Sequence, residues 1–372
     1  MAATGDFSLG VEEEYLVVDR RSRAPRLDGE RLLAAARARL GERVQPELQV
    51  SQLEVGTAVC TTLDEVRRQL GWLRRGLAAA LAEEGAAIAA AGTHPFASWR
   101  DGRITPRETY RRIEDDYRQL AREQLICGCH VHVAVADPEL AVQVLNRVRP
   151  WLPALVALAA NSPFWMGADT GYASFRTEVW RRWPTAGTPG TFADRAAYDR
   201  LVADLLATGS IDDPARLYFD VRPSSRYPTL EFRVTDVCLD AEEAVMVAGL
   251  VRALCRTCAG EARDGRPLPE VRTELIRAAT WRAARHGLDA DLLDLAARRA
   301  APAAEVVGGL LAAVRPALDG AGEWDEVGAL VRRTLARGTG AARQRRALAA
   351  AGRFEDVVDL VVAETAPEPL PG

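Results

Sequence analysis

Several features that would place the chain in a common class are missing. There is no run of basic residues, and the formal net charge of −4 argues against a nucleic-acid or membrane-surface partner. The N-terminus has no charged segment followed by an apolar one, so we expect no signal peptide. The most apolar stretch, residues 151–160, is too short and too proline-flanked to span a bilayer.

Cysteine is scarce and scattered. Of the six cysteines, Cys127 and Cys129 lie too close in one predicted strand to pair comfortably, and Cys255 and Cys258 fall at helical spacing. This pattern predicts free thiols and a reducing, cytoplasmic setting.

The familiar catalytic and phosphate-binding motifs are also absent. The sequence contains neither G-x-x-x-x-G-K-[ST] nor a G-x-G-x-x-G that follows a strand. No Ser–His–Asp or Cys–His arrangement stands out, and His94 and His286 look incidental to any chemistry. A protein of this kind that uses ATP must hold the nucleotide through metal ions and arginines.

The chain has 372 residues, enough for a substantial core in one large domain or two. Predicted strands concentrate before Val237 and helices after it, which predicts an α+β fold with a largely antiparallel sheet covered by helices on one face. We expect one domain over 1–372, with a strand-rich part (1–240), a helical part (241–364) and a frayed tail (365–372). The predicted strands are 7–18, 46–59, 86–91, 125–135 and a hairpin over 217–237; the predicted helices are 29–40, 63–84 with Thr62 as cap, 109–123, 138–160, 192–208, 241–262, 270–285, 288–299, 303–314, 323–336 and 341–364.

The first strand carries two acidic side chains on one face. Glu12 and Glu14 are two residues apart in an otherwise apolar strand, so they lie about 7 Å apart on one face, with Glu13 on the other. Two such carboxylates repel each other unless a cation lies between them, and Mg²⁺ prefers carboxylate and phosphate oxygens. The alternative is a solvated strand face near a sheet edge.

Two further strands repeat this pattern, with His130 and His132 on one and Glu231 and Arg233 on the other. Three polar pairs in one chain predict a sheet whose second face lines a polar cavity that holds metal and phosphate together. His132 is equally well explained as a hydrogen-bonded core residue. A zinc site in CGCHVH is disfavoured, because Cys129 and His130 point to opposite faces of a strand.

A long irregular segment between the predicted helices is rich in aromatic residues. Such loops are usually functional or disordered, and the tryptophans and phenylalanines favour an ordered, functional segment. We expect residues 164–183 to cover the site.

Several motifs occur together and in a recognisable order: GVEEE, SQLEVGTAVC, CGCHVHV, NSPFW-x-G and RPSSRYPTLEFRVTD. In this order they resemble the type 2 glutamate–cysteine ligase family, and within it the bacterial carboxylate–amine ligase branch. The resemblance implies a glutamine-synthetase-like fold, with a curved antiparallel sheet around a funnel-shaped site. It also implies ATP and Mg²⁺, with release of ADP and phosphate.

The resemblance also implies roles for individual residues. Arg233 matches the position that contacts the transferred phosphoryl group, and with Glu14 and Glu231 forms the implied catalytic set. Glu47 is a further metal candidate, but it lies seven residues from Glu54, so a bulge or turn must separate them if both are ligands. The implied metal ligands are Glu12, Glu14, Glu54, His130 and Glu231; the implied anion-binding residues are Arg176, Arg222 and Arg226, with Arg233.

The resulting hypothesis is an ATP-dependent ligase that joins the γ-carboxylate of glutamate to an amine such as cysteine through an acyl phosphate. Two alternatives remain: a ligase for another amine, bulky or aromatic, and a metal- or nucleotide-binding protein without turnover. A homodimer is the default expectation for assembly.

Overall fold

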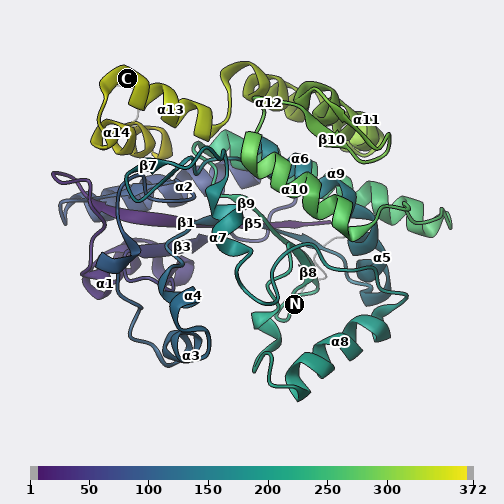
Figure 1. Ribbon diagram of the computed structural model, residues 1–372, viewed down its shortest axis with the longest axis horizontal. Coiled ribbons are helices and arrows are strands. Elements are labelled where there is room, and N and C mark those ends of the chain that lie inside the picture. The colour runs from purple at the N-terminus through teal and green to yellow at the C-terminus, as the bar shows by residue number, and fades with distance from the viewer. Residues whose placement is uncertain (1–6, 367–372) are drawn as a thin grey trace.

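A single large sheet forms the centre of the structure. The computed structural model describes residues 7–366. Six of the seven strands of this sheet follow the order β2-β3-β1-β5-β9-β8, the seventh, β4, pairs with β1, and all these pairings are antiparallel (Figure 1). The α+β prediction with a mainly antiparallel sheet is confirmed. The strands are β1 (Leu9–Asp19), β2 (Val44–Pro46), β3 (Gln52–Gly56), β4 (Ala86–Ala89), β5 (Gly128–Ala134), β8 (Val221–Pro223) and β9 (Thr229–Asp236).

Strand β1 is the central strand of this sheet. It pairs with β5 over residues 9–13, with β3 over residues 12–16 and with β4 over residues 16–19. Tyr15 and Leu16 are completely buried. The acidic residues of β1 therefore lie in the middle of the sheet and not at a solvated edge.

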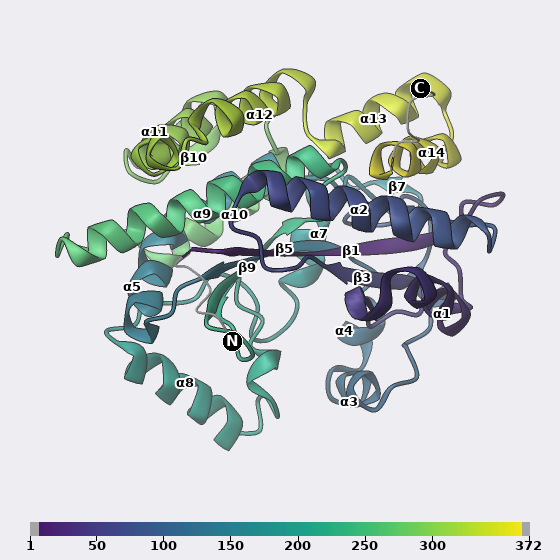
Figure 2. The same cartoon turned by 180° about the vertical axis from the view of Figure 1, so that it is seen from behind.

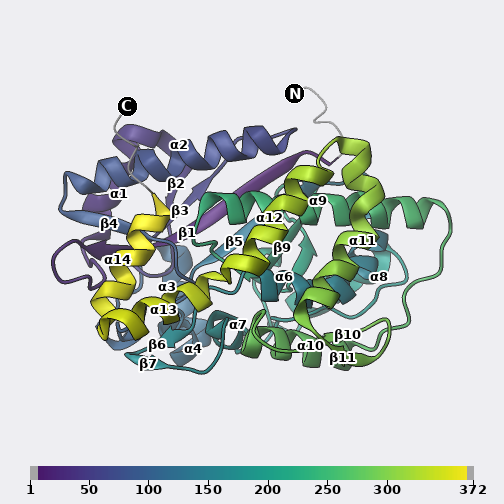
Figure 3. The same ribbon diagram turned by 90° about the horizontal axis from the view of Figure 1, so that it is seen from above.

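Helices cover one face of the sheet in two layers. Helices α2 (Leu63–Ala82) and α9 (Ala241–Arg263) pack on the strands, and α11 (Ala303–Ala321) and α12 (Trp324–Arg337) pack on α9 (Figures 2 and 3). The last helix, α14 (Phe354–Thr365), reaches the sheet at β4. The remaining helices are α1 (Gly29–Leu40), α3 (Glu108–Tyr117), α4 (Gln119–Arg122), α5 (Pro138–Val148), α6 (Leu152–Leu158), α7 (Phe175–Trp180), α8 (Arg195–Ala207), α10 (Thr273–His286) and α13 (Gly340–Ala351).

Helix α2 begins and packs as its sequence predicts. The Thr62 hydroxyl accepts a hydrogen bond from the backbone N–H of Glu65 at 3.1 Å, and the Glu65 carboxylate accepts one from the N–H of Thr62 at 3.3 Å. This reciprocal arrangement satisfies donors that a helix start leaves free. The apolar stripe of the helix is buried: Val66, Leu70, Leu73, Leu77 and Leu81.

The prediction of a single strand over 46–59 is wrong in one respect. The segment contains a turn, so that β2 and β3 lie side by side, with Gln45 opposite Glu54. Residues 47–51 form the connection, where the N–H of Gln52 donates to the carbonyl of Gln49 at 2.9 Å. This turn changes the side to which Glu47 points relative to a straight strand.

Several of the predicted helices also differ. The helix predicted over 109–123 is divided into α3 and α4 at Arg118, whose φ is 49°, and the helix predicted over 138–160 is divided into α5 and α6 around residues 149–151. In place of the helix predicted over 288–299, residues 292–301 form a short hairpin of β10 (Leu292–Asp294) and β11 (Arg299–Ala301), because the Asp294 carboxylate accepts hydrogen bonds from the N–H groups of Ala296 and Ala297 and closes a turn. The helix predicted over 341–364 is split into α13 and α14 at Gly352, whose φ of 78° is a left-handed conformation that favours glycine. Helix α14 ends at Thr365, and residues 367–372 of the predicted tail lie outside the described residues.

Candidate active site

The acidic triplet of β1 divides between the two faces of the sheet. Glu13 points towards α2, where it is completely buried and its Oε2 accepts a hydrogen bond from the Nε of Arg74 at 3.0 Å. Glu12 and Glu14 point to the opposite face, as alternation along a strand requires. On this face Glu14 lies opposite Glu54, and Glu12 lies opposite His130.

Strand β5 adds its two histidines to the same face. The Nδ1 of His130 lies 3.5 Å from Glu12 Oε2, and its Nε2 lies 3.6 Å from Glu14 Oε1. The Nε2 of His132 lies 3.5 Å from Glu12 Oε2, and His132 is opposite Glu231 of β9 in the register. The predicted polar pairs of three strands are therefore brought together.

Glu47 joins this group from the turn after β2. The turn resolves the odd spacing to Glu54, because β2 and β3 are separate strands. Glu47 Oε2 accepts a hydrogen bond from the N–H of Leu48 at 2.7 Å, which fixes the carboxylate.

Together these side chains form three overlapping triads. In each triad one ligand atom per residue lies within 4.8 Å of the others, a spacing that can hold a metal ion. Glu12 and Glu54 each belong to two of the triads, so the candidate ion sites follow one another across the sheet. The triads are Glu12–His132–Glu231, Glu12–Glu54–His130 and Glu14–Glu47–Glu54.

The protonation of the carboxylates reflects their crowding. Burial and the charge of Glu14 raise the pKa of Glu47 to about 8. Burial, together with Glu12 and Glu47, raises the pKa of Glu54 well above its ordinary value. Burial would raise the pKa of Glu12 as well, but the nearby imidazoles of His130 and His132 outweigh it and lower that pKa. Negative charge is thus concentrated here beyond what the protein neutralises.

The pKa values of the two histidines shift in opposite directions. Burial and the nearby charge of Arg233 lower the pKa of His130. Burial opposes protonation of His132, but its contact with Glu12 raises the pKa. Both ring nitrogens of His130 and the Nε2 of His132 are buried without a hydrogen-bond partner among residues 7–366. Unpartnered buried nitrogens beside carboxylates suit a metal site.

Two arginines flank Glu231. Arg233 forms an ion pair with Glu231 Oε1, and the Nε of Arg222 lies 3.0 Å from Glu231 Oε2. Burial alone would raise the pKa of Glu231, but the charges of Arg233 and Arg222 lower it. Arg222 also donates to the carbonyls of Ala215 and Leu217, at 2.6 Å each. Most donors of Arg222 are therefore used within the protein.

The other two predicted arginines lie in different surroundings. Arg176 of α7 is buried, and its guanidinium carbon lies 5.6 Å from the centre of the Trp180 ring. The guanidinium carbon of Arg233 lies 5.3 Å from the centre of the same ring, so both guanidinium groups lie near Trp180. Arg226 is exposed in the β8–β9 connection, where its backbone N–H donates to Ser224 Oγ at 3.3 Å and its guanidinium has no hydrogen-bond partner among the described residues.

Some residues of this region were not predicted. The hydroxyl of Tyr110 donates to the carbonyl of Pro46 at 2.7 Å, next to Glu47. Thr229 contacts His132 Nδ1 at 3.0 Å and so orients the imidazole. For Thr229 the sequence carried a signal, since it lies two residues before Glu231 on the same strand face; for Tyr110 it carried none.

Residues 8–360 match the model of glutamate–cysteine ligase family 2 (GCS2). The chain belongs to this family. A protein of Frankia alni named "Putative glutamate--cysteine ligase 2-2" is 47% identical over 380 residues, covering 98% of each chain. A relative of the same name from Frankia casuarinae is 46% identical, but the chain spans only 42% of its length.

Solved structures agree on the fold of this family member. The glutamate–cysteine ligase of Francisella tularensis, solved in complex with AMP, superposes with a TM-score of 0.71 at 14% identity, covering 99% of this chain and 91% of that one. At this identity the likeness shows the fold alone. The family predicted from GVEEE, CGCHVHV and the other motifs is confirmed.

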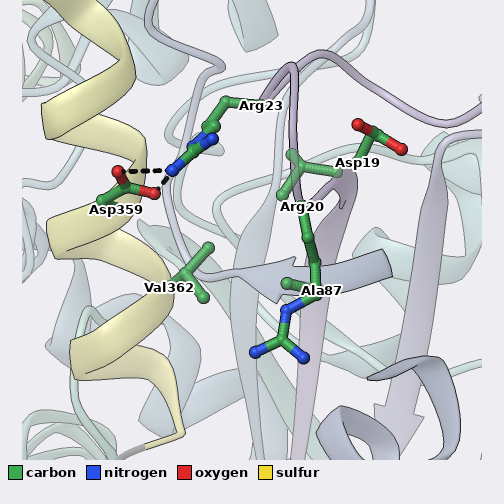
Figure 4. Close-up of a pocket in the computed structure, with 7 residues that line it drawn as sticks. Asp19, Arg20, Arg23, Ala87, Asp359 and Val362 are labelled. Carbon is green, nitrogen blue, oxygen red and sulfur yellow. Dashed lines mark hydrogen bonds and ion pairs between the residues drawn. The ribbon is translucent and has the colours of Figure 1, made fainter. Parts of the chain in front are cut away.

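Cavities elsewhere in this family member do not coincide with the polar face. One of about 210 Å³ lies between the end of β1 and α14, where Arg23 and Asp359 form an ion pair of 2.9 Å (Figure 4). Another of about 590 Å³ lies on the helical side, lined by Arg74, Arg337 and Glu364 among others. In both cavities, the ion pairs are satisfied within the protein.

Between residues 7 and 366 no helix has the length and apolar character needed to cross a membrane.

Proposed function

We propose that this protein is an ATP-dependent carboxylate–amine ligase. It joins the γ-carboxylate of L-glutamate to an amine such as cysteine and releases ADP and phosphate. The observation that carries the proposal is the set of three overlapping carboxylate–imidazole triads, bordered by Arg233, on one face of the sheet. Family membership supports the same reaction.

The donor set fits Mg²⁺. Carboxylate oxygens are its preferred protein ligands, and the raised pKa values of Glu47 and Glu54 indicate that positive charge is lacking. When bound, the ions supply charge neutralisation for the phosphates of ATP. The residues proposed to hold them are Glu12, Glu14, Glu54, His130 and Glu231, together with Glu47 and His132.

The reaction has two steps. The γ-carboxylate of glutamate attacks the γ-phosphorus of ATP, which forms an acyl phosphate and releases ADP. The amine nitrogen then attacks the acyl carbon, phosphate leaves, and the amine proton passes to solvent. Arg233 lies beside the triads, where its guanidinium can stabilise charge on the transferred group. Trp180 packs against Arg233 and limits the access of water, which would hydrolyse the acyl phosphate.

The aromatic surroundings bear on the choice of amine. Trp180, Trp183 and Tyr218 contact one another, with ring centres 5.1–6.5 Å apart, next to Arg233. This grouping supports a bulky or aromatic amine as the second candidate substrate.

We further propose a reducing, cytoplasmic setting, because all six cysteines are buried free thiols.

The test measures ADP release with Mg²⁺ and ATP, using glutamate alone, glutamate with cysteine, and glutamate with other amines, and identifies products by mass. We expect Glu14→Gln and Glu231→Gln to lower ADP release by at least about 100-fold, because each removes a charge from the triads. Glu108→Gln is the control, since Glu108 lies on the exposed surface of α3 with 75% of its side chain accessible.

The outcomes separate the candidates. Formation of γ-glutamylcysteine supports the cysteine ligase, and faster turnover with another amine reassigns the second substrate. Wild-type turnover in both glutamine variants would refute the assigned site. Binding of Mg²⁺ and ATP without ADP release under any condition would leave a non-catalytic binding protein.

A further inference from the structure

Gly128, the first residue of β5, makes room for a buried guanidinium group. A Cβ atom built on Gly128 would lie 2.3 Å from one terminal nitrogen of Arg176 and 2.9 Å from its guanidinium carbon. Such distances are shorter than real Cβ contacts, so any other residue here would displace the end of the Arg176 side chain. The backbone N–H of Gly128 also donates to Glu14 Oε2 at 2.6 Å, which places this position at the edge of the candidate active site.

The backbone of Arg176 is held by a network centred on Asp236. The Asp236 carboxylate accepts hydrogen bonds from the Ser162 and Ser174 hydroxyls, at 2.7 Å each, and from the N–H of Asn161 at 2.8 Å. The Ser162 hydroxyl oxygen in turn accepts from the N–H of Arg176 at 3.0 Å. Asp236 thereby joins the end of β9 to the start of α7, and all five residues are buried.

Arg176 nevertheless lacks a full set of partners. Its only hydrogen bond from the guanidinium within residues 7–366 runs from a terminal nitrogen to the carbonyl of Arg233 at 3.3 Å. The Nε atoms of Arg176 and of Arg233 are both buried without a partner in that range. A buried cation with unused donors is costly unless an anion joins it. Both guanidinium groups lie over one ring, that of Trp180.

We propose that Gly128 and Asp236 are positioning residues that hold Arg176 ready to bind an anionic oxygen group of a substrate. The inference rests on the proposed function for the identity of the substrates. A carboxylate of glutamate and a phosphate of ATP share the chemistry that a guanidinium recognises. Because the sequence contains no lysine, arginine supplies every permanently cationic side chain available for such a group.

The test compares Gly128→Ala with Gly10→Ala. Gly10 is a matched control in β1 on the same face of the sheet, where an added Cβ would lie 3.7 Å from the Cβ of His132, an ordinary contact. We expect Gly128→Ala to raise the KM of glutamate or of ATP at least tenfold, with kcat within threefold of the wild type. A rise for glutamate identifies the carboxylate as the anion, and a rise for ATP identifies the phosphate.

Direct binding separates this inference from the proposed reaction. Calorimetric titration with glutamate and with inorganic phosphate requires no turnover, and at least one of the two should bind Gly128→Ala tenfold more weakly than Gly10→Ala. If the wild type releases no ADP but this difference is found, the reaction is refuted and the anion site stands.

Other results would overturn the inference itself. It fails if Gly128→Ala matches Gly10→Ala in both KM values and both titrations, or if its loss is confined to kcat. Should Gly128→Ala not fold, Arg176→Met replaces it, since this variant removes the guanidinium and keeps a side chain of similar length. Wild-type binding of both anions by Arg176→Met would equally refute the assignment.

Discussion

The buried ion pair between Arg74 and Glu13 allows a quantitative test of how the first strand is held. Besides Glu13, the Arg74 guanidinium donates to the carbonyls of Cys238, Leu239 and Thr365 at 2.9, 3.1 and 3.3 Å. We predict that Arg74→Leu lowers the free energy of unfolding by about 3–5 kcal/mol, because removal of one partner leaves the other charge buried and unpaired.

The pH dependence of this loss follows from the carboxylate that remains. The unpaired Glu13 can escape its penalty by taking up a proton, which for a glutamate of ordinary pKa costs about 3.7 kcal/mol at pH 7 and about 1 kcal/mol at pH 5. In the variant, the folded state therefore favours the protonated form, and stability is lost as the pH rises. The difference between variant and wild type should shrink by about 2–3 kcal/mol from pH 7 to pH 5.

Urea unfolding followed by tryptophan fluorescence measures both quantities. Arg68→Leu is the control on the same helix, because Arg68 pairs with Asp64 at the surface, where their side chains are 64% and 62% exposed, and such a pair contributes little. The double variant Glu13→Leu/Arg74→Leu should recover much of the loss, since it leaves no unpaired charge. A destabilisation of Arg74→Leu below about 1 kcal/mol, or one that does not change with pH, would refute this account.

Two further predictions concern protonation. Burial lowers the pKa of His94 to about 4, and its neutral Nδ1 accepts hydrogen bonds from the N–H groups of Phe96 and Ala97. Stability that is present above about pH 6.5 should therefore be lost as the pH falls towards 4, by up to about 3 kcal/mol. The urea unfolding midpoint of His94→Gln should depend less on pH over this range than that of the wild type. Glu47, with a pKa of about 8, should release a proton when Mg²⁺ binds at pH 7. Calorimetry in buffers of different ionisation enthalpy should therefore detect more protons released by the wild type than by Glu47→Gln, in which only Glu54 retains a raised pKa.

The candidate site was largely predictable from local spacing. The pairs Glu12/Glu14, His130/His132 and Glu231/Arg233 each occupy alternate positions of a strand, and alternation fixes their common face without knowledge of the fold. Antiparallel pairing in register then brings the faces together, as His132 opposite Glu231 illustrates. Sequence spacing was sufficient because period-2 alternation is insensitive to the position of a strand in the sheet.

Other features depend on information that spacing does not contain. Glu47 reaches the site because a turn separates β2 from β3, and no glycine or proline pair marks that turn in the sequence. Residues 288–299 have helical apolar spacing, yet the Asp294 carboxylate closes a turn instead. In such cases tertiary packing and side-chain capping override local propensity.

The sequence position of Arg74 indicates that it is buried, although a prediction from apolar residues alone overlooks it. It lies four residues after Leu70 and three before Leu77, both on the buried stripe of α2. A charged residue at that position requires an opposite charge in the core, and Glu13 is its partner from the face of β1 that carries no ligand.

The contact between Arg74 and Thr365 has a consequence for biosynthesis. The two residues lie 291 positions apart, and the hydroxyl of Thr365 also accepts from the N–H of Ala90, 275 positions away. The ribosome makes α14 long after β1, so the back of the central strand stays incompletely covered until α14 has been made. Contacts of such long range slow folding and expose apolar surface in the meantime. This protein should therefore depend on chaperones more than a chain of equal length whose central strand is completed by nearby residues.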